Sequence, residues 1–314
     1  MDGVVVIDKP AGLTSHDVVS QVKKILGAKK AGHTGTLDPL ATGVLPVCVN
    51  EATKLAGFLA DDNKEYQATM LLGIKTDTLD TEGKIVDRSD NVVSDREIEA
   101  MLARMVGKIK QIPPAYSAVK YCGDPLYKWA RRGVMIEAAP REVEIRHISV
   151  KDISFPRVTF QVACSKGTYI RTLCADVGEL LGCGACMSGL RRLRSGYFSE
   201  DMAVALTIGS PAEKKEELLA GMLPITRLLP SATVIEVEDE LANKLRDGLQ
   251  PSVKTMKAHA LPFLEAGDMV KFVNRRGCLI AIAEMVTPVS NFLKIDEKCQ
   301  AARIVRVFNN IQNC

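Results

Sequence analysis

The sequence predicts an α+β protein, in which a mixed, largely antiparallel sheet with packed helices is followed by a small β-rich C-terminal domain. Up to about residue 228, strand-like and helix-like segments mix without the strict alternation that a parallel sheet requires. Short strand-like segments dominate after a linker-like stretch at 223–230. A chain of 314 residues is also longer than one hydrophobic core usually organises. We therefore expect domains at 1–228 and 229–314.

The N-terminal residues predict a strand followed by a helix. The strand is the apolar run 4–7, which ends at Lys9. Thr14 or Ser15 is a suitable N-cap for the helix, which extends to about Leu26 and has one apolar face. A glycine follows directly, as is common after a helix C-terminus.

Residues 32–46 have the most unusual composition in the chain, with three glycines, two prolines, three threonines, one histidine and one carboxylate. Pro39 fixes its own φ and disfavours helical geometry at Asp38. The pattern indicates a loop that holds the Asp38 carboxylate in a fixed place among small residues. An apolar strand at 44–49 anchors its far end. An ordinary turn before a strand has a similar composition, so other segments must decide between the two.

The remaining elements follow from the same periodicities and end signals. Ser94 and Glu97 form a capping box at the start of one helix. The other expected elements before the linker are a helix at 51–59, strands at 65–73, 143–150 and 158–164, a polar turn at 76–83, and a helix that begins near Arg171. Beyond the linker we expect strands at 233–237, 269–273, 278–283 and 304–308, and a helix at 239–245.

The segment 108–146 carries more positive charge than the whole chain. It has eight Lys or Arg residues against four Asp or Glu, whereas the net charge of the chain is +3. It also contains three tyrosines and the only tryptophan. Basic residues interleaved with aromatic ones suit phosphate contact and base stacking. A solvated face with a few core aromatics is the alternative. We interpret this segment as an insertion that leaves the core.

The cysteines and the N-terminus indicate the compartment. Nine cysteines are scattered, and the N-terminus lacks a basic region followed by an apolar block. We expect free thiols, a cytoplasmic location and no membrane span. Cys183 and Cys186 form a C-x-x-C pair, which is typical of redox or zinc sites, but no second pair completes a four-ligand zinc site. Two structural thiols are the simpler interpretation, and we expect no metal.

Several separated motifs together resemble the tRNA pseudouridine-55 synthase (TruB) family, bacterial branch. The first is 9–15 (KPAGLTS), and 32–43 (GHTGTLDPLATG) is similar to the family's catalytic loop. The others are 113–118 with 120–121, 126–127 and 130–131, which resemble its RNA-gripping insertion, then 167–171 (GTYIR) and 190–192 (LRR). The resemblance covers most of residues 3–197 in the family's order. The C-terminal part resembles the family's small PUA-type RNA-binding domain only in size, position and strand content.

The resemblance implies roles for individual residues. Asp38 is the catalytic carboxylate that starts cleavage of the N-glycosidic bond, and Arg171 pairs with it. Tyr66 stacks on the target base and takes part in proton movement. Four further residues bind or support the substrate: Tyr169 and Leu190 line the base pocket, His33 fills the space that the displaced uridine leaves, and Lys9 supports the active-site wall or a phosphate.

The implied reaction explains why these residue types are needed. Uracil must detach from the ribose, rotate and rejoin through carbon, so no cofactor is required. A carboxylate can act as a nucleophile at C1′ of the ribose or at C6 of the base, or it can remove a ribose proton on a glycal route. The sequence leaves these three routes open. Because the uridine lies inside a folded RNA loop, it must first be flipped out.

The resemblance also implies the partners. The substrate is the T-loop and T-arm of tRNA, with no guide RNA, no membrane and no obligatory protein partner, and the protein is a monomer. An RNA-binding or RNA-folding module is a second hypothesis, based on the basic segment and the small C-terminal domain. A thiol redox protein built on the C-x-x-C pair is a third.

Overall fold

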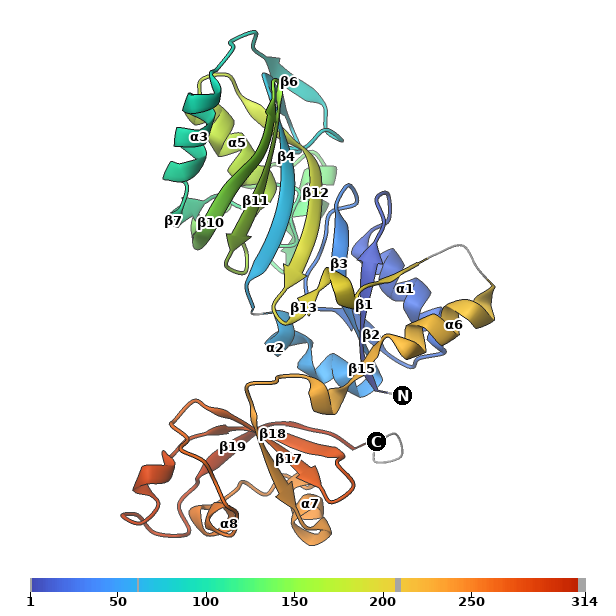
Figure 1. Ribbon diagram of the computed structural model, residues 1–314, viewed down its shortest axis with the longest axis vertical. Coiled ribbons are helices and arrows are strands. Elements are labelled where there is room, and N and C mark those ends of the chain that lie inside the picture. The colour runs from blue at the N-terminus through green and yellow to red at the C-terminus, as the bar shows by residue number, and fades with distance from the viewer. Residues whose placement is uncertain (1, 61, 207–209, 310–314) are drawn as a thin grey trace.

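The computed structural model describes residues 2–60, 62–206 and 210–309. They form one large and one small sheet with helices packed on them (Figure 1), and two two-stranded hairpins, of which one pairs β5 (Ile74–Thr76) with β6 (Ile85–Arg88). The large sheet has 11 strands and the small one has four. Strand pairs in the large sheet are antiparallel except for β1–β14 and β3–β12. The predicted α+β class, with a largely antiparallel sheet and a small β-rich C-terminal part, is confirmed. The domain boundary at residue 228 stays a prediction.

The main path of the large sheet runs β14-β1-β3-β12-β4-β11-β10-β7. Its strands are β1 (Gly3–Lys9), β2 (Ala31–His33), β3 (Thr42–Val49), β4 (Lys64–Leu72), β7 (Gly107–Gln111), β10 (Arg141–Ser154), β11 (Arg157–Cys164), β12 (Ala185–Ser195), β13 (Phe198–Ser199), β14 (Val204–Ala205) and β15 (Met222–Pro224). Strand β12 lies at the centre, between β3 and β4. It was not predicted, because its arginines interrupt the apolar pattern of a buried strand.

The helices in this part of the chain are α1 (Ser15–Leu26), α2 (Ala56–Ala60), α3 (Asp95–Arg104), α4 (Leu126–Arg131), α5 (Ile170–Leu180) and α6 (Pro211–Ala220). Thr14 is the N-cap of α1 in a capping box, and the predicted box of Ser94 and Glu97 caps α3. The helix expected at 51–59 is instead a 3-10 segment, Asn50–Leu55, followed by α2. No helix within the described ranges is long and apolar enough to span a membrane.

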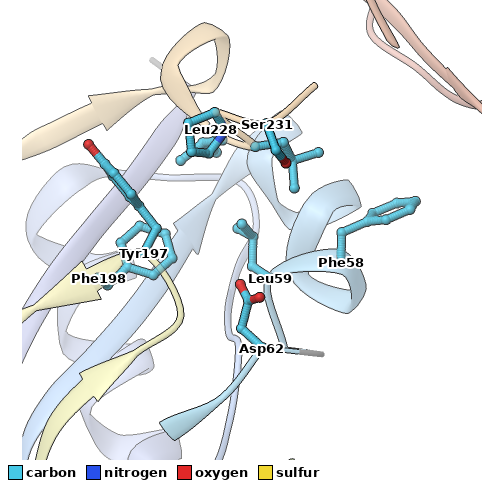
Figure 2. Close-up of a pocket in the computed structure, with 9 residues that line it drawn as sticks. Phe58, Leu59, Asp62, Tyr197, Phe198, Leu228 and Ser231 are labelled. Atoms are coloured by element: carbon cyan, nitrogen blue, oxygen red, sulfur yellow. The ribbon is translucent and has the colours of Figure 1, made fainter. Parts of the chain in front are cut away.

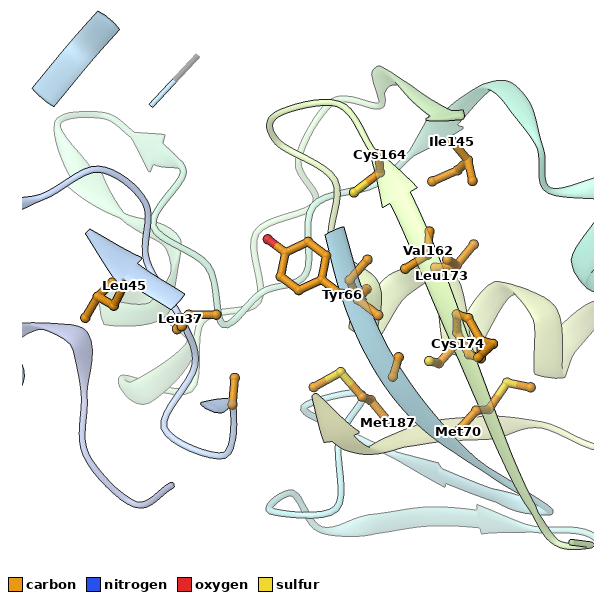
Figure 3. Packing of buried hydrophobic residues seen from close by; sticks show 14 of the residues in the cluster. Leu37, Leu45, Tyr66, Met70, Ile145, Val162, Cys164, Leu173, Cys174 and Met187 are labelled. Atoms are coloured by element: carbon orange, nitrogen blue, oxygen red, sulfur yellow. The ribbon is translucent and has the colours of Figure 1, made fainter. Parts of the chain in front are cut away.

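Alternation along β4 places Tyr66 in the main hydrophobic core. Tyr66, Ala68, Met70 and Leu72 are buried, while the residues between them are more exposed. Their neighbours in this core come from helices α3 and α5 and from strands β10 to β12. The Tyr66 ring lies between Leu37 and Leu45 on one side and the other labelled core residues on the other, and its hydroxyl is on the side of Leu37 and Leu45 (Figure 3). The core therefore fixes the ring and leaves its polar end beside the loop.

The small sheet has the order β16-β17-β18-β19. Its elements are β16 (Thr233–Val237), α7 (Asp239–Arg246), α8 (Val253–Lys257), β17 (Met269–Asn274), β18 (Leu279–Met285) and β19 (Ala302–Val307). One buried cluster joins the two sheets: Val4, Val6 and Val44 of the large sheet pack in it with Val273, Leu279 and Phe308. Nζ of the buried Lys271 also donates to the carbonyls of Thr226 and Leu228, each at 3.1 Å.

The basic segment 108–146 leaves the sheet over a narrower range than its charge pattern indicated. Strands β7 and β10 pair from Gly107 with Ile145 to Gln111 with Arg141. The excursion proper is therefore 112–140, with the short hairpin of β8 (Lys120–Tyr121) and β9 (Asp124–Pro125) followed by α4. The aromatic residues contact one another and nearby arginines: Tyr121 lies edge-on to Trp129 at 6.2 Å, and Arg132 lies over the Trp129 ring.

Candidate active site

Asp38 lies on the loop between β2 and β3, and the 9–15 segment holds this loop from behind. The Ser15 hydroxyl accepts from the Leu37 N–H at 2.8 Å and donates to its carbonyl at 3.0 Å. The Gly12 N–H donates to the Pro39 carbonyl at 2.9 Å. Two distant motifs of the sequence thus form one structural unit that fixes the residues on either side of the carboxylate.

Lys9 belongs to the same support. Its fully buried ammonium donates to the carbonyls of Pro10, Pro39 and Ala41, at 2.9, 3.1 and 2.6 Å. Burial lowers the pKa of Lys9 from 10.5 to about 8, although the charge of Asp38 opposes that change. Of the two roles expected for Lys9, the contacts match support of the active-site wall, since its three N–H donors already have acceptors.

Asp38 and Arg171 form the ion pair that the family resemblance implies. Nε of Arg171 lies 2.9 Å from Oδ2 of Asp38, and Nη2 donates to Oδ1 at 3.2 Å. The Asp38 side chain is 31% exposed, whereas that of Arg171 is 5% exposed. Burial raises the pKa of the Asp38 carboxyl above its ordinary value, and the Arg171 guanidinium opposes this rise. The arginine therefore favours the ionised form that a nucleophile requires.

Three further groups fix the guanidinium of Arg171. It donates to the carbonyls of Thr78 at 3.0 Å and Tyr116 at 2.9 Å. Its Nη1 also lies 3.6 Å from Oδ2 of the buried Asp80. Asp80 did not emerge from the sequence, which indicated only a polar turn at 76–83. The available signal was a carboxylate in a turn rich in threonine and aspartate. The polar side chains of such turns, however, usually form hydrogen bonds within the turn itself.

Tyr66 faces the Asp38 loop from β4 and is 8% exposed. Burial raises the pKa of its hydroxyl, and the charge of Asp38 acts in the same direction. The nearby Arg192 guanidinium opposes the rise. Arg192 is the residue paired with Tyr66 across β12 and β4, and sequence reasoning gave it no role of its own.

Tyr169 directly precedes α5 and is held by a buried amide. The Gln111 side chain accepts from the Tyr169 N–H at 3.0 Å and donates to its carbonyl at 3.3 Å. Burial raises the pKa of the Tyr169 hydroxyl, with Asp38 again contributing in that direction. Tyr169 therefore lies within electrostatic reach of Asp38. Gln111 is a third supporting residue that sequence reasoning missed.

Leu190 and His33 lie on strands that flank the loop. Leu190 of β12 pairs with Ala68 of β4 and packs partly buried against the main core. His33 ends β2, and burial lowers its pKa, which favours the neutral ring. Its Nδ1 atom is buried with no hydrogen-bond partner in the described part of the chain. The surroundings of His33 therefore favour an uncharged ring.

The C-x-x-C pair is buried. Cys183 and Cys186 are buried free thiols, and burial raises the pKa of both, that of Cys186 to about 11. A raised pKa disfavours the reactive thiolate. Within the described ranges, no group of three or more His, Cys, Asp or Glu side chains is arranged to hold a metal. The expectation of free thiols is wrong for Cys278, which is disulfide-bonded.

A separate pocket of about 220 Å³ lies beside α2, where the chain leads toward the small sheet (Figure 2). Phe58, Leu59, Asp62, Tyr197, Phe198 and the segment 228–231 line it. None of the predicted site residues lies among them. The site around Asp38 is thus assembled on loops and strand ends elsewhere.

Comparisons with known proteins agree with this fold. The family description "TruB family pseudouridylate synthase (N terminal domain)" matches residues 23–170, and "tRNA pseudouridylate synthase B C-terminal domain" matches 171–229. A protein of Syntrophus aciditrophicus named "tRNA pseudouridine synthase B" is 51% identical, with 99% of both chains covered. One of the same name from Geobacter sulfurreducens is 42% identical, with 98% of this chain and 100% of the relative covered.

Solved structures resemble the whole chain. A structure described as a Cbf5-Nop10-Gar1 complex contains a chain with a TM-score of 0.73 and 30% identity, covering 98% of this chain and 85% of that one. A structure of an H/ACA RNP bound to a substrate RNA contains another, with a TM-score of 0.70 and 27% identity, covering 99% and 86%.

The fold, the Asp38–Arg171 pair and these similarities define a pseudouridine synthase, an isomerase. Within this class, the chain belongs to the TruB family.

Proposed function

We propose that this enzyme converts uridine 55 in the T-loop of tRNA to pseudouridine. The observation that carries the proposal is the half-buried Asp38 carboxylate, held by Arg171 through two nitrogens in a chain of the TruB family. The names of the similar proteins support tRNA as the substrate. The target uridine is flipped out of the RNA loop, at a cost of a few kcal/mol. We place this activity in the cytoplasm.

Asp38 starts the reaction in its ionised form. Cleavage of the N-glycosidic bond frees the base, which rotates and rejoins the ribose through C5. The ring of Tyr66 stacks on the base during this rotation, and Tyr169 and Leu190 complete the base pocket. The neutral ring of His33 occupies the vacancy in the RNA loop. Nothing is oxidised and no group is donated in this conversion, so it consumes no redox or group-donating cofactor.

The excursion at 112–140 and its flanking strands supply charge for the RNA backbone. Three of the eight basic residues between 108 and 146 form ion pairs, namely Lys108, Lys128 and Arg146. The other five make no ion pair with described residues, and all are exposed: Lys110, Lys120, Arg131, Arg132 and Arg141. Unpaired surface cations favour phosphate contacts. We propose that the small C-terminal unit, PUA-like in function, adds RNA contacts, and that the monomer acts without guide RNA or an obligatory protein partner.

The exposed cations also favour a second activity, in which the protein helps tRNA to fold independently of catalysis. An Asp38→Asn variant separates the two, since a pure RNA-folding role would survive the change.

Pseudouridine mapping on an unmodified tRNA transcript tests the main proposal. The wild type should form pseudouridine at the T-loop uridine, and Asp38→Asn should form none while it still binds the transcript. An unchanged T-loop uridine after incubation with wild-type protein would overturn the proposal. Equal product with both proteins would overturn the role of Asp38.

A further inference from the structure

Arg192 is a buried cation without an anionic partner in the described part of the chain. Arg192 is only 1% exposed, and its side chain is among the largest that are fully buried in the described residues. Nε donates to the Val44 carbonyl at 2.7 Å, and Nη2 donates to the Gly35 carbonyl at 3.1 Å. No Asp or Glu among the described residues lies within ion-pair distance of it. Its partners are backbone carbonyls on either side of Asp38.

The backbone of Arg192 lies where the two halves of the site meet. In β12 it pairs with Gly43 of β3 on one side and with Tyr66 of β4 on the other. A Cβ atom at Gly43 would lie only 2.3 Å from the Arg192 carbonyl oxygen, so only glycine allows this approach. The side chains of a cross-strand pair lie on the same face of a sheet. The guanidinium contacts the Asp38 loop through the Gly35 and Val44 carbonyls, and it also interacts with the Tyr66 hydroxyl.

A structural role alone does not explain the charge. Burial of a guanidinium is costly unless its charge is compensated, and a neutral amide such as glutamine also donates hydrogen bonds to carbonyls. The Arg192 charge affects the pKa of Lys9, His33 and Tyr66. Of these three groups, only Tyr66 has an anionic form that a positive charge stabilises, and the guanidinium lowers its pKa against the effect of burial. Lys9, the second buried cation behind the loop, has all three donors occupied by carbonyls.

The isomerisation provides a use for that charge. As the base leaves the ribose, its electron pair stays on N1, which must finally carry a proton. Once C5 has bonded to C1′, C5 must lose a proton, and the electrons of its C–H bond restore the ring double bond. One hydroxyl beside the base can serve both atoms: it protonates N1, becomes a phenolate, and recovers a proton from C5. Protons and charge then balance without any other reactant.

We propose that Arg192 is a positioning residue that joins Tyr66 to both ends of the Asp38 loop and stabilises the phenolate form of Tyr66 during this proton exchange. The inference rests on the proposed isomerisation. Its first consequence concerns only the ionisation of Tyr66, which can be measured without any RNA.

The test compares Arg192→Gln and Arg192→Lys with the matched control Arg191→Gln. Arg191 neighbours Arg192, but it pairs with Asp8 and Glu200 and is half-exposed. Protein labelled with ¹³C at the tyrosine Cζ is titrated by NMR, and Tyr66→Phe identifies the Tyr66 signal. Single-turnover rates and tRNA Kd values are measured for the same variants, each also in the Tyr66→Phe background.

We expect Arg192→Gln to raise the pKa of Tyr66 and to lower the single-turnover rate about 100-fold, the lower end of the usual range for acid–base catalysis. The tRNA Kd should change little. Arg192→Lys, which keeps the charge, should recover part of the rate, and Arg191→Gln should leave the Tyr66 titration unchanged. In the Tyr66→Phe background, Arg192→Gln should lower the single-turnover rate by a much smaller factor than it does in the presence of Tyr66.

An unchanged Tyr66 titration in Arg192→Gln would overturn the inference, as would an equal rate loss with and without Tyr66. If Arg192→Gln does not fold, the coupling in Arg192→Lys decides: a rate loss that persists unchanged in the Tyr66→Phe background would overturn the proposal, and a loss that disappears there would support it. A shifted titration in a protein that leaves tRNA unmodified would instead refute the proposed function and keep the Arg192–Tyr66 coupling.

Discussion

Arg171 holds Asp38 along one side of its guanidinium, with Nε 2.9 Å from Oδ2 and Nη2 donating to Oδ1 at 3.2 Å. The remaining donor positions are directed at the carbonyls of Thr78 and Tyr116. A planar fork with five donors meets all these acceptors at once, whereas a lysine ammonium is a point charge with three donors. The carboxylate thus takes its orientation from an arginine that is itself fixed from two other loops.

Arg171→Lys should therefore lose activity although it keeps the charge. We expect the single-turnover rate to fall about 100-fold or more, because small misplacement of a reacting group costs rates of that order. The tRNA Kd should stay within a factor of a few. Quench-flow measurement with saturating enzyme reports the rate directly. A rate equal to that of the wild type would show that charge alone, and not the fork, positions Asp38.

Ser15 and Thr14 offer a matched pair of substitutions in adjacent residues. Ser15→Ala leaves the buried N–H and carbonyl of Leu37 without their partner, which should cost about 1–3 kcal/mol of unfolding free energy. Because Leu37 precedes Asp38, the rate should fall as well. Thr14→Ala removes only the helix cap. It should lower the unfolding free energy by about 1 kcal/mol and leave the rate unchanged. Urea unfolding and single-turnover assays separate the two. Equal rates would contradict the role of Ser15.

Most of the candidate site residues could be named from the sequence, because they lie in or near segments whose composition or motifs stand out. The loop around Asp38 combines glycine, proline and threonine with one carboxylate, and the motif that contains Tyr169 and Arg171 follows in the order of a known family. Helices α1 and α3 were predictable from their caps and apolar faces. These features are local, so a short stretch of sequence is enough to indicate them.

The supporting residues could not be predicted, because their roles depend on contacts between distant segments. Arg192 acts on a loop about 150 positions away in the chain, and Gln111 holds Tyr169 from the edge strand β7. The Asp80 carboxylate accepts hydrogen bonds from Thr78 and Glu82 of its own turn, so the sequence gives no reason to expect a contact with a distant arginine. Strand β12 was missed because arginines that are buried or paired in the structure resemble solvated residues in the sequence. Only the sheet pairing shows what such charges contact.

The affinity for tRNA should fall steeply with salt, because each phosphate contact releases bound counterions. The slope of log K against log salt should change by about 0.7–0.9 for each contact. Arg131→Ala with Arg132→Ala should therefore reduce the slope by about 1.5 if both bind phosphates. The control Lys128→Ala removes a charge that is already paired with Asp124 and should change the slope less. A flat salt dependence of the wild type would show that the exposed cations of 108–146 do not contact the backbone.

Lys9 should give the reaction an alkaline limit. Its pKa is lowered from 10.5 to about 8, and three carbonyls share its three protons. Deprotonation removes one donor, so the support of Pro39 and Ala41 weakens and the single-turnover rate should fall as pH rises through about 8. Stability should not follow the same course. Between pH of about 8 and 10.5 the folded chain binds fewer protons at Lys9 than the unfolded chain, so the contribution of Lys9 to the unfolding free energy rises with pH.

A Lys9→Arg variant provides the control, because arginine does not deprotonate in this range. Its rate should be lower overall, since the larger guanidinium must displace the loop, but the fall near pH 8 should disappear. Rates are measured from pH 6 to 10 beside circular dichroism at each pH, so that unfolding is distinguished from loss of catalysis. The same fall near pH 8 in Lys9→Arg would assign the alkaline limit to another group. A wild-type rate that stays constant to pH 10 would show that two donors are enough to hold the Asp38 loop.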